Sequence, residues 1–170
     1  MRLADFILDN IEPILQAWED FAKTITPASI GMDSAALRDH AEQMLRTIAA
    51  DLRTSQTRRE AIAKSHGEAP PADAETAAET HAVIRQSSGF TVEQMVSEYR
   101  ALRTSVLMLW MPHTQLDHKQ VMDDLIRFNE AVDQALAESV VSYSGRWMRR
   151  ATSFWGFSGM TCAAPWARSC

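Results

Sequence analysis

The sequence predicts an all-α fold, and three observations lead to this prediction. Apolar side chains recur at intervals of three and four residues along most of the chain, which is the spacing of a buried helix face. No segment shows the sustained apolar-polar alternation of a half-buried strand. Capping residues, glycines and prolines separate the periodic segments. With 170 residues, of which 46% are hydrophobic, the chain is expected to form one domain with a substantial core.

The first periodic segment is LADFILDNIEPILQAWEDFAKTI, residues 3 to 25, in which Pro13 marks the first turn of the main helix. The segment TPASIGMDS then breaks the pattern, and Asp33 or Ser34 can cap the helix that follows. That helix is predicted to turn five apolar side chains inward, namely Leu37, Met44, Leu45, Ile48 and Leu52.

A shorter helical piece, QTRREAIAKSH, is predicted to end at Gly67 and to lead into a surface loop, GEAPPADAE. Helical spacing resumes from 75 to 88 and stops at Gly89, the usual residue type after a helix C-terminus. The next helix has a clear beginning, because Thr91 and Gln94 have the spacing of a capping box. Phe90 and Met95 can form the hydrophobic staple across it.

This helix is predicted to continue to Pro112 and to bury Val96, Tyr99, Leu102, Val106, Leu109 and Trp110. The last regular helix is predicted from about Asp117 to Tyr143. Its apolar residues alternate spacings of three and four, so the helix suits a core, a dimer seam or a rigid rod that carries a signal out of the domain. These residues are Val121, Leu125, Phe128, Val132, Leu136, Val140 and Tyr143.

The charge distribution argues against nucleic acid and membrane partners. The formal net charge is -5, but residues 145–170 carry four arginines and no acid, so the remainder carries -9. An acidic body repels phosphate backbones. No apolar run reaches the roughly 20 residues that span a bilayer, and the N-terminal segment does not resemble a signal peptide. Both cysteines lie in the terminal segment, so no disulfide framework is expected and a cytoplasmic location is predicted.

No motif predicts a catalytic, cofactor-binding or metal-binding residue, because the sequence lacks a glycine-rich phosphate loop, a zinc signature and a nucleophile motif. His113 and His118 flank a loop, but a metal would need a third ligand. His40 and His81 lie in helical segments, and each is read as a partly buried histidine in preference to a haem ligand. Asp123 and Asp124, beside Arg127, are read as a solvated, salt-bridged face.

Several stretches resemble the RsbRD-type N-terminal sensor domain, named after the co-antagonists of the kinase RsbT in bacterial stress signalling. The same domain is the soluble input module of many bacterial sensor histidine kinases. The matching stretches cover nearly all of residues 1 to 144, which we take as the domain. They are LADFILDNIEPILQAWEDFA, LRDHAEQMLRTIAADLRT, KSHG, AAETHAVIRQSSGFTVEQMVSEYRALRTSVLMLW and DLIRFNEAVDQALAESVVSYS.

The resemblance implies a globin-like helical bundle without haem, usually dimeric, that passes a signal through its long C-terminal helix. The family has no established catalytic residue, so none is assigned. The family-motif positions are read first as helix-packing and hydrogen-bonding residues, and second as a ligand or partner surface. They are Glu98, Tyr99, Arg100, Arg127, Phe128, Asn129 and Asp133.

The segment 145–170 is expected to be an irregular tail that is translated out of frame. In kinases of this type a phosphoacceptor segment resembling LFLGxLGHDLRxPL follows the sensor helix. When each codon is shifted by one base, five residues are forced without choice: Met160–Thr161 gives aspartate, Phe154–Trp155 leucine, Trp155–Gly156 glycine, Trp147–Met148 aspartate and Trp166–Ala167 glycine. With free wobble bases, residues 146–170 decode as AVDAARDLFLGILGHDLRSPLGAIM. The lost phosphoacceptor histidine would straddle the codons of Gly159 and Met160. The alternative is a genuine amphipathic tail that touches membranes.

The leading hypothesis is therefore a cytoplasmic input domain of a two-component sensor histidine kinase, truncated before its catalytic core and without enzyme activity of its own. It is expected to form a homodimer through helical faces and to interact with a partner kinase or with response-regulator pathway components. The first alternative is a free-standing regulatory module that controls a partner kinase. The second is a haem-binding, globin-type sensor.

Overall fold

The computed structural model describes residues 1–38, 40–65, 75–115 and 117–154, with side chains described up to residue 145. All regular structure in these ranges is helical, so the predicted all-α class is confirmed. The helices are α1 (Leu3–Asp9), α2 (Ile11–Ala22), α3 (Ser34–Arg38), α4 (Ala41–Arg53), α5 (Arg58–Ser65), α6 (Ala77–Ser87), α7 (Val92–Trp110), the 3-10 turn η1 (Met111–His113) and α8 (His118–Phe154).

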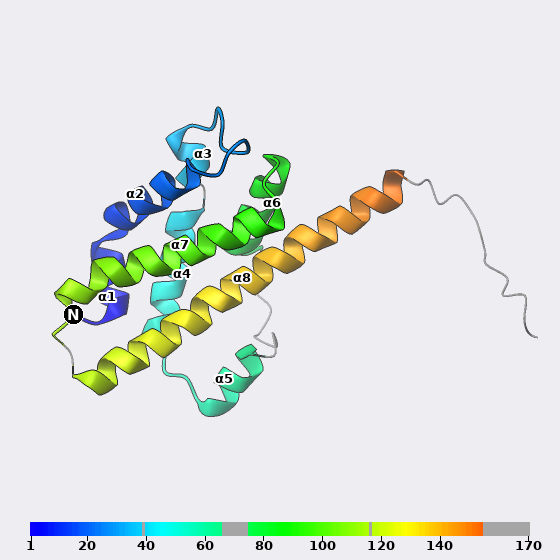
Figure 1. Cartoon of the computed structure of the whole chain (residues 1–170). Coiled ribbons are helices and arrows are strands. Elements are labelled where there is room, and N and C mark those ends of the chain that lie inside the picture. Colours follow the sequence, from blue (N-terminus) through cyan, green and yellow to red (C-terminus); the bar gives the residue numbers. More distant parts are fainter. Residues whose placement is uncertain (39, 66–74, 116, 155–170) are drawn as a thin grey trace, which may run out of the picture.

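Two layers of helices enclose the core (Figure 1). Helix α2 packs along α7, whereas α8 packs against α6, α4 and α7, and α1 packs on α4. The side chains between these helices form one apolar cluster, in which Trp18, Trp110, Phe6 and Phe128 are among the largest buried members. Helix α5 buries no side chain and lies at the edge of the bundle. The chain therefore builds one core around α7 and α8.

The beginning of α7 agrees with the sequence prediction. The Thr91 hydroxyl accepts a hydrogen bond from the Gln94 backbone N–H at 3.1 Å, and the Gln94 side chain accepts one from the Thr91 N–H at 2.9 Å. Phe90 and Met95 are both buried beside this cap. Gly89 ends α6 with a φ of 85°, which favours glycine over residues with a side chain. Local capping chemistry thus fixes the turn between α6 and α7.

The first periodic segment forms two helices instead of one. Pro13 is the third residue of α2, where its missing N–H costs nothing within the first turn. In a continuous helix the Pro13 ring would clash with the carbonyl of Asp9, and α1 ends at that residue. The Asn10 side chain at the junction donates to the Phe6 carbonyl at 2.9 Å. Pro13 therefore divides into two helices a segment that the apolar spacing alone predicts to be continuous.

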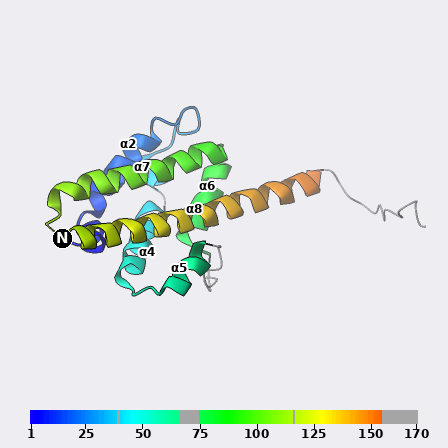
Figure 2. The ribbon, with the colours of Figure 1, turned by 60° about the horizontal axis from the view of Figure 1, so that its bottom comes forward.

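Helix α8 is longer than the predicted helix. It runs from His118 to Phe154 and so continues through 145–154, a segment that was expected to be irregular. The apolar periodicity stops near Ser144–Gly145, but one glycine costs a helix only about 1 kcal/mol, and the residues after it are ordinary helix formers. Figures 1 and 2 show the C-terminal part of α8 extending past the rest of the bundle. The expected tail residues 155–170 lie outside the described residues, as does the predicted helix end at Gly67.

The solvated face predicted for Asp123, Asp124 and Arg127 is wrong for Asp124, which is 3% exposed. Its carboxylate accepts hydrogen bonds from the Arg2 guanidinium and, at 2.9 Å, from the backbone N–H of Leu3, the first residue of α1. Asp124 therefore caps a helix that begins 121 residues earlier in the chain, a contact that spacing along one helix cannot reveal.

Candidate functional site

A buried ion pair lies at the centre of the bundle. Arg85 of α6 and Glu98 of α7 are both fully buried, and the Arg85 Nε lies 2.9 Å and 3.0 Å from the two carboxylate oxygens. His81, one turn before Arg85, places its Nε2 3.2 Å from the same carboxylate. A carboxylate can only accept hydrogen bonds, so the Nε2 of His81 carries the proton in this arrangement. One acid thus receives two donors from a neighbouring helix.

The Arg85 guanidinium also joins this pair to α3. Its Nη1 and Nη2 donate to the carbonyls of Ala36 and Leu37 at 2.9 Å and 2.6 Å. The Trp18 indole N–H of α2 donates to the same Leu37 carbonyl at 3.0 Å. These carbonyls belong to the end of a short helix and have no partner within it, so Arg85 acts as its C-terminal cap from another element.

A second polar chain connects the core to α8. The Ser139 hydroxyl donates to the Ala78 carbonyl at 2.6 Å and lies 2.7 Å from the Tyr99 hydroxyl. Because Ser139 has one proton and gives it to Ala78, Tyr99 is the donor in the second bond. The Tyr99 ring lies edge-on to the rings of Trp18 and His81. Ser139 therefore joins α8 to the buried polar cluster of His81, Arg85, Glu98 and Tyr99 through Tyr99.

A further acidic residue is held at the outer end of α2. Glu19 is 3% exposed and accepts hydrogen bonds from Lys23, Ser34 and Arg38. The bond from Lys23, followed by those from Ser34 and Arg38, lowers the pKa of Glu19 from 4.5 to about 2. The arrangement fixes α3 against α2 and leaves the carboxylate ionised, so it is a structural anchor.

A cavity of about 710 Å³ lies between α4, α6 and α8. Its apolar wall includes Met44 and Ile48 of α4, Ala78 of α6, and Ala131 and Ala135 of α8. The alanines leave space that larger side chains would fill. The volume falls in the range of about 300 to 1,000 Å³ that is typical of small-molecule sites. Polar side chains surround this wall, among them Gln43, Thr47, Thr76, Gln134 and Glu138.

The cavity and the buried polar cluster share a wall. The Ala78 carbonyl, which accepts from Ser139, belongs to a residue that lines the cavity. Met44, another lining residue, has its sulfur 3.2 Å from the Tyr99 hydroxyl. Glu138 and Ser139 are neighbours on α8, one facing the cavity and the other the cluster. A molecule in the cavity would therefore lie one residue away from the contact between α8 and the core.

The predicted motif residues do not form a single site. Glu98 and Tyr99 lie in the buried cluster and Phe128 in the apolar core, whereas Arg100 is exposed because the next residue on a helix turns by about 100°. Asn129 donates to the Leu125 carbonyl within α8.

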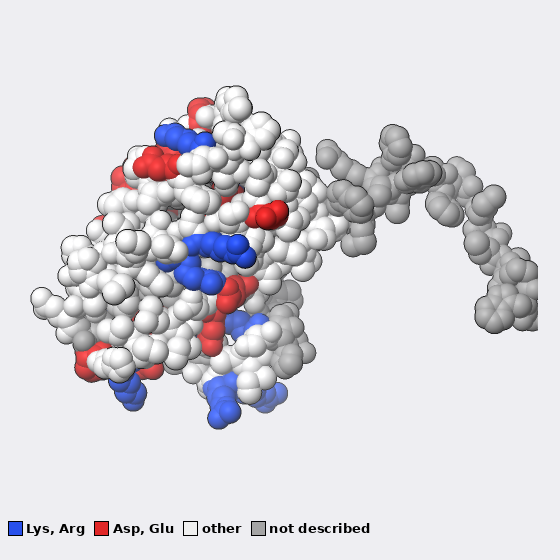
Figure 3. Space-filling view, in the orientation of Figure 1, with Lys and Arg blue, Asp and Glu red and all other residues white. Residues whose placement is uncertain are grey.

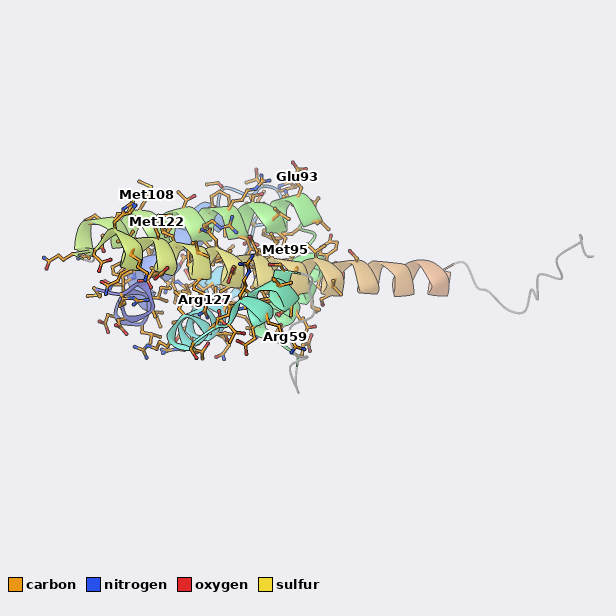
Figure 4. The ribbon with its side chains drawn as sticks, turned by 90° about the horizontal axis from the view of Figure 1, so that it is seen from below. Arg59, Glu93, Met95, Met108, Met122 and Arg127 are labelled. Atoms are coloured by element: carbon orange, nitrogen blue, oxygen red, sulfur yellow. The ribbon has the colours of Figure 1, made fainter. Side chains whose placement is uncertain are left out.

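The two remaining motif residues bind groups outside the core. Asp133 is exposed and pairs with Arg103 of α7. Arg127 donates to the carbonyls of Asp51 and Thr54 at 2.7 Å and 3.0 Å, and Figure 4 shows it in the region where α8 meets α4 and α5. These residues therefore join α8 to two different neighbours.

The sequence reading missed Arg85, Ser139 and Glu138. Arg85 follows His81 by four residues on the apolar stripe of α6, and a charged residue at a core position is the signal that could have identified it. His81 is fully buried, beyond the partial burial predicted, and does not line the cavity, whereas His40 does. His113 lies beside the Phe6 ring. Within the described residues, no group of three potential ligands could hold a metal ion.

Comparison of the chain with protein families, with curated proteins and with solved structures finds no match. None of the helices in the described part of the chain has both the length and the apolar composition needed to cross a bilayer. The structural features that bear on function are therefore the cavity, the buried polar cluster and the helix that contacts both.

Proposed function

We propose that this chain is a cytoplasmic sensory input domain of a bacterial two-component histidine kinase, which transmits its signal by repacking of α8. The proposal includes a globin-like bundle that works without haem. The observation that carries it is the course of α8. This helix contributes Phe128, Val132 and Ser139 to the core and then continues to Phe154, beyond the body of the bundle.

The packing of α8 supports a role in transmission. Its contacts with the bundle are distributed along its length, from Asp124 on α1, through Arg127 on the end of α4, to Tyr143, which donates to the Phe90 carbonyl at 2.8 Å. Because α8 is held at several points, a rearrangement of the side chains at the cavity should move the helix as a unit. Helix shifts of 1 to 2 Å are a common form of signal transfer.

The resemblance to RsbRD-type sensor domains supports the same proposal, since those domains lie before the phosphotransfer helix of sensor kinases. The partners would be a second copy of this chain, together with a partner kinase or response-regulator pathway components. A free-standing module that controls a partner kinase is the second candidate. The exposed apolar side chains Met122, Ile126 and Val141 of α8 are compatible with it as well as with a homodimer, because such a surface can bind either another protein or a second copy.

A fusion experiment tests the transmission role. Residues 1–144 would be joined in frame to the dimerisation and catalytic domains of a sensor histidine kinase, with zero to seven alanines inserted after Ser144. If α8 continues as a coiled coil, each insertion rotates the kinase by about 100°, so autophosphorylation should rise and fall with the helical repeat of about 3.6 residues and should return to its starting level at seven. Autophosphorylation that does not vary with the insertion length would contradict the proposal.

The out-of-frame origin of residues 145–170 is also a proposal and has a separate test. The gene should read GHDLRSPL in the shifted frame across these codons, followed in that frame by kinase coding sequence. The five residues forced by tryptophan and methionine codons support this expectation. A shifted frame that lacks these residues would contradict it without affecting the role proposed for α8.

A further inference from the structure

The carboxylate of Glu138 determines which ligands suit the cavity. Its Oε2 accepts a hydrogen bond from the Thr76 hydroxyl at 2.9 Å, and its Oε1 accepts one from the Gln134 amide at 2.8 Å. Both donors are neutral. Among the side chains that the structure describes, no lysine, arginine or histidine forms an ion pair with Glu138. The N-terminus of α6 beside Thr76 supplies only about half a positive charge, so the site stays negative.

Of the other two acids that line the cavity, Asp51 differs from Glu138 in this respect. The Asp51 carboxylate lies 2.8 Å from the Lys64 ammonium and 3.4 Å from the Arg127 guanidinium, so Asp51 contributes no unpaired negative charge to the wall. Glu75, which precedes Thr76, adds a second carboxylate to the wall near Glu138. The unbalanced negative charge is therefore concentrated where α6 begins and α8 passes.

We propose that the cavity binds a small organic cation, an amine or quaternary ammonium with an apolar body. The cationic group would bind Glu138, and the apolar body would cover Met44, Ile48 and the alanines. A partly buried carboxylate binds a cation more strongly than an exposed one, because water screens the interaction less. A ligand of negative charge would be repelled by Glu138 and Glu75, and a neutral one would gain only the apolar contact.

Such a cation would be the stimulus of the proposed input domain. Its effect on α8 rests on the proposed function. A cation at Glu138 competes for the carboxylate with Thr76 and Gln134. Thr76 caps α6, and Ser139, the next residue after Glu138, contacts Ala78 and Tyr99. Binding therefore acts on the contact between α6 and α8 without any further intermediate.

Three phenylalkyl probes of ten carbons each separate charge from apolar contact: phenylbutylamine, phenylbutanol and phenylbutyrate. Their affinities for the full chain would be measured by isothermal titration calorimetry. Phenylbutylamine should bind about tenfold more tightly than phenylbutanol, and phenylbutyrate should bind most weakly. No measurable binding of phenylbutylamine at millimolar concentration, or equal affinity for the amine and the alcohol, would overturn the proposal.

Two variants locate the binding site. Glu138→Gln keeps the shape and an acceptor for Thr76 but removes the charge, so the affinity for phenylbutylamine should fall about tenfold while that for phenylbutanol stays unchanged. Ala135 is partly buried in the cavity wall, so Ala135→Leu should fill part of the cavity and weaken binding of both probes. Circular dichroism verifies that the variants fold. Unchanged phenylbutylamine affinity in Glu138→Gln would overturn the proposal.

Matched control variants are available elsewhere on the surface. Glu93→Gln removes an exposed carboxylate at the start of α7, which Figure 4 shows at the opposite end of that helix from Met108. Ala50→Leu adds the same bulk to an exposed position of α4. Neither residue lines the cavity, so neither variant should change phenylbutylamine affinity. A tenfold loss in either control would place the bound probe outside the cavity and overturn the proposal.

A second measurement separates the ligand from the proposed function. Hydrogen exchange of the backbone amides of residues 140–154 would be followed with and without saturating phenylbutylamine. Altered exchange is expected if the cavity controls α8. Binding that depends on Glu138 but leaves this exchange unchanged would uphold the cation site and contradict transmission through α8. Absent binding contradicts the cation site alone, because another stimulus could still act on the helix.

Discussion

The carboxylate of Glu98 accepts hydrogen bonds from Arg85 and His81 in a place that water does not reach. Replacing Glu98 by leucine leaves the Arg85 guanidinium buried without its counter-charge. The variant should lose about 3 to 5 kcal/mol of unfolding free energy, which is the usual cost of breaking a buried ion pair from one side. Urea unfolding followed by circular dichroism measures this loss.

The double variant Arg85→Met with Glu98→Leu is the control, since it removes both charges and keeps apolar volume. It should be clearly more stable than Glu98→Leu alone, although the carbonyls of Ala36 and Leu37 then lose their donor. A Glu98→Leu variant that loses less than about 1 kcal/mol would show that this pair does not organise the core.

Glu19 provides the pH dependence that the structure predicts. Its folded-state pKa is about 2, below the ordinary value of 4.5, so the ionised form stabilises the fold. This contribution is complete above about pH 4.5 and is lost as the pH falls toward about 2. The stability difference between the wild type and Glu19→Gln should therefore shrink across this interval. A difference that stays constant from pH 6 to pH 2.5 in thermal unfolding would contradict the depressed pKa.

At the residue scale the sequence indicates which residues belong to the buried cluster better than it indicates which residues they contact. Glu98 and Tyr99 stand out as motif positions, and both lie in the buried cluster. Their partners His81, Arg85 and Ser139 come from other helices, and the relative rotation of those helices is not encoded in the periodicity of any one of them. The same limit explains Asp124, which has the local sequence of a surface residue but caps α1 from a distance.

At the scale of one helix, Phe128 anchors α8 in the core. Its ring is fully buried between α8 and the bundle, so Phe128→Ala should destabilise the protein by about 3 to 5 kcal/mol through lost apolar burial and the cavity left behind. Chemical unfolding of the purified variant measures the change. Ile126→Ala, two residues earlier and 53% exposed, should lose less than about 1 kcal/mol. Similar losses for both variants would contradict the predicted orientation of α8.

Helix boundaries that carry a local capping signal are predicted more accurately in this chain than boundaries without one. The capping box at Thr91 is a local signal made of side chains that contact their own backbone, so the sequence alone suffices. The end of α8 depends instead on whether helix formation tolerates Gly145, which is a balance of small free energies. The break between α1 and α2 depends on Pro13, whose place in the first turn was predicted although its effect on the preceding helix was not.

At the scale of the whole molecule, the all-α class follows from periodicity, but the cavity does not. Ala131 and Ala135 fit the apolar spacing of α8 as well as larger residues would, so the pattern predicts packing at positions that border a space. Which helices face each other across that space is a property of the assembled bundle. The sequence therefore predicts the helices whose residues border the cavity but not the cavity itself.

The surface of the bundle presents an exposed stripe along α8. Exposed residues recur at positions that project within about 100° of each other around the helix, and the apolar members are Met122, Ile126, Ala137 and Val141. Met108 of α7, 69% exposed, lies near Met122 in Figure 4. The face over the C-terminal half of α7 carries few charged side chains in Figure 3. This combination favours a homodimer whose seam includes α8.

A single charge on this stripe should disrupt such a dimer. Ile126→Lys places an ammonium in the apolar seam, where its desolvation is unfavourable, and the dissociation constant should rise at least tenfold, equivalent to about 1.4 kcal/mol. Sedimentation equilibrium across a range of concentrations measures it. Ile62→Lys is the matched control, because Ile62 is 51% exposed, close to the 53% of Ile126, but lies on α5. Equal dissociation in both variants would place the seam elsewhere, and a monomeric wild type would mean that α8 transmits its signal without a second copy.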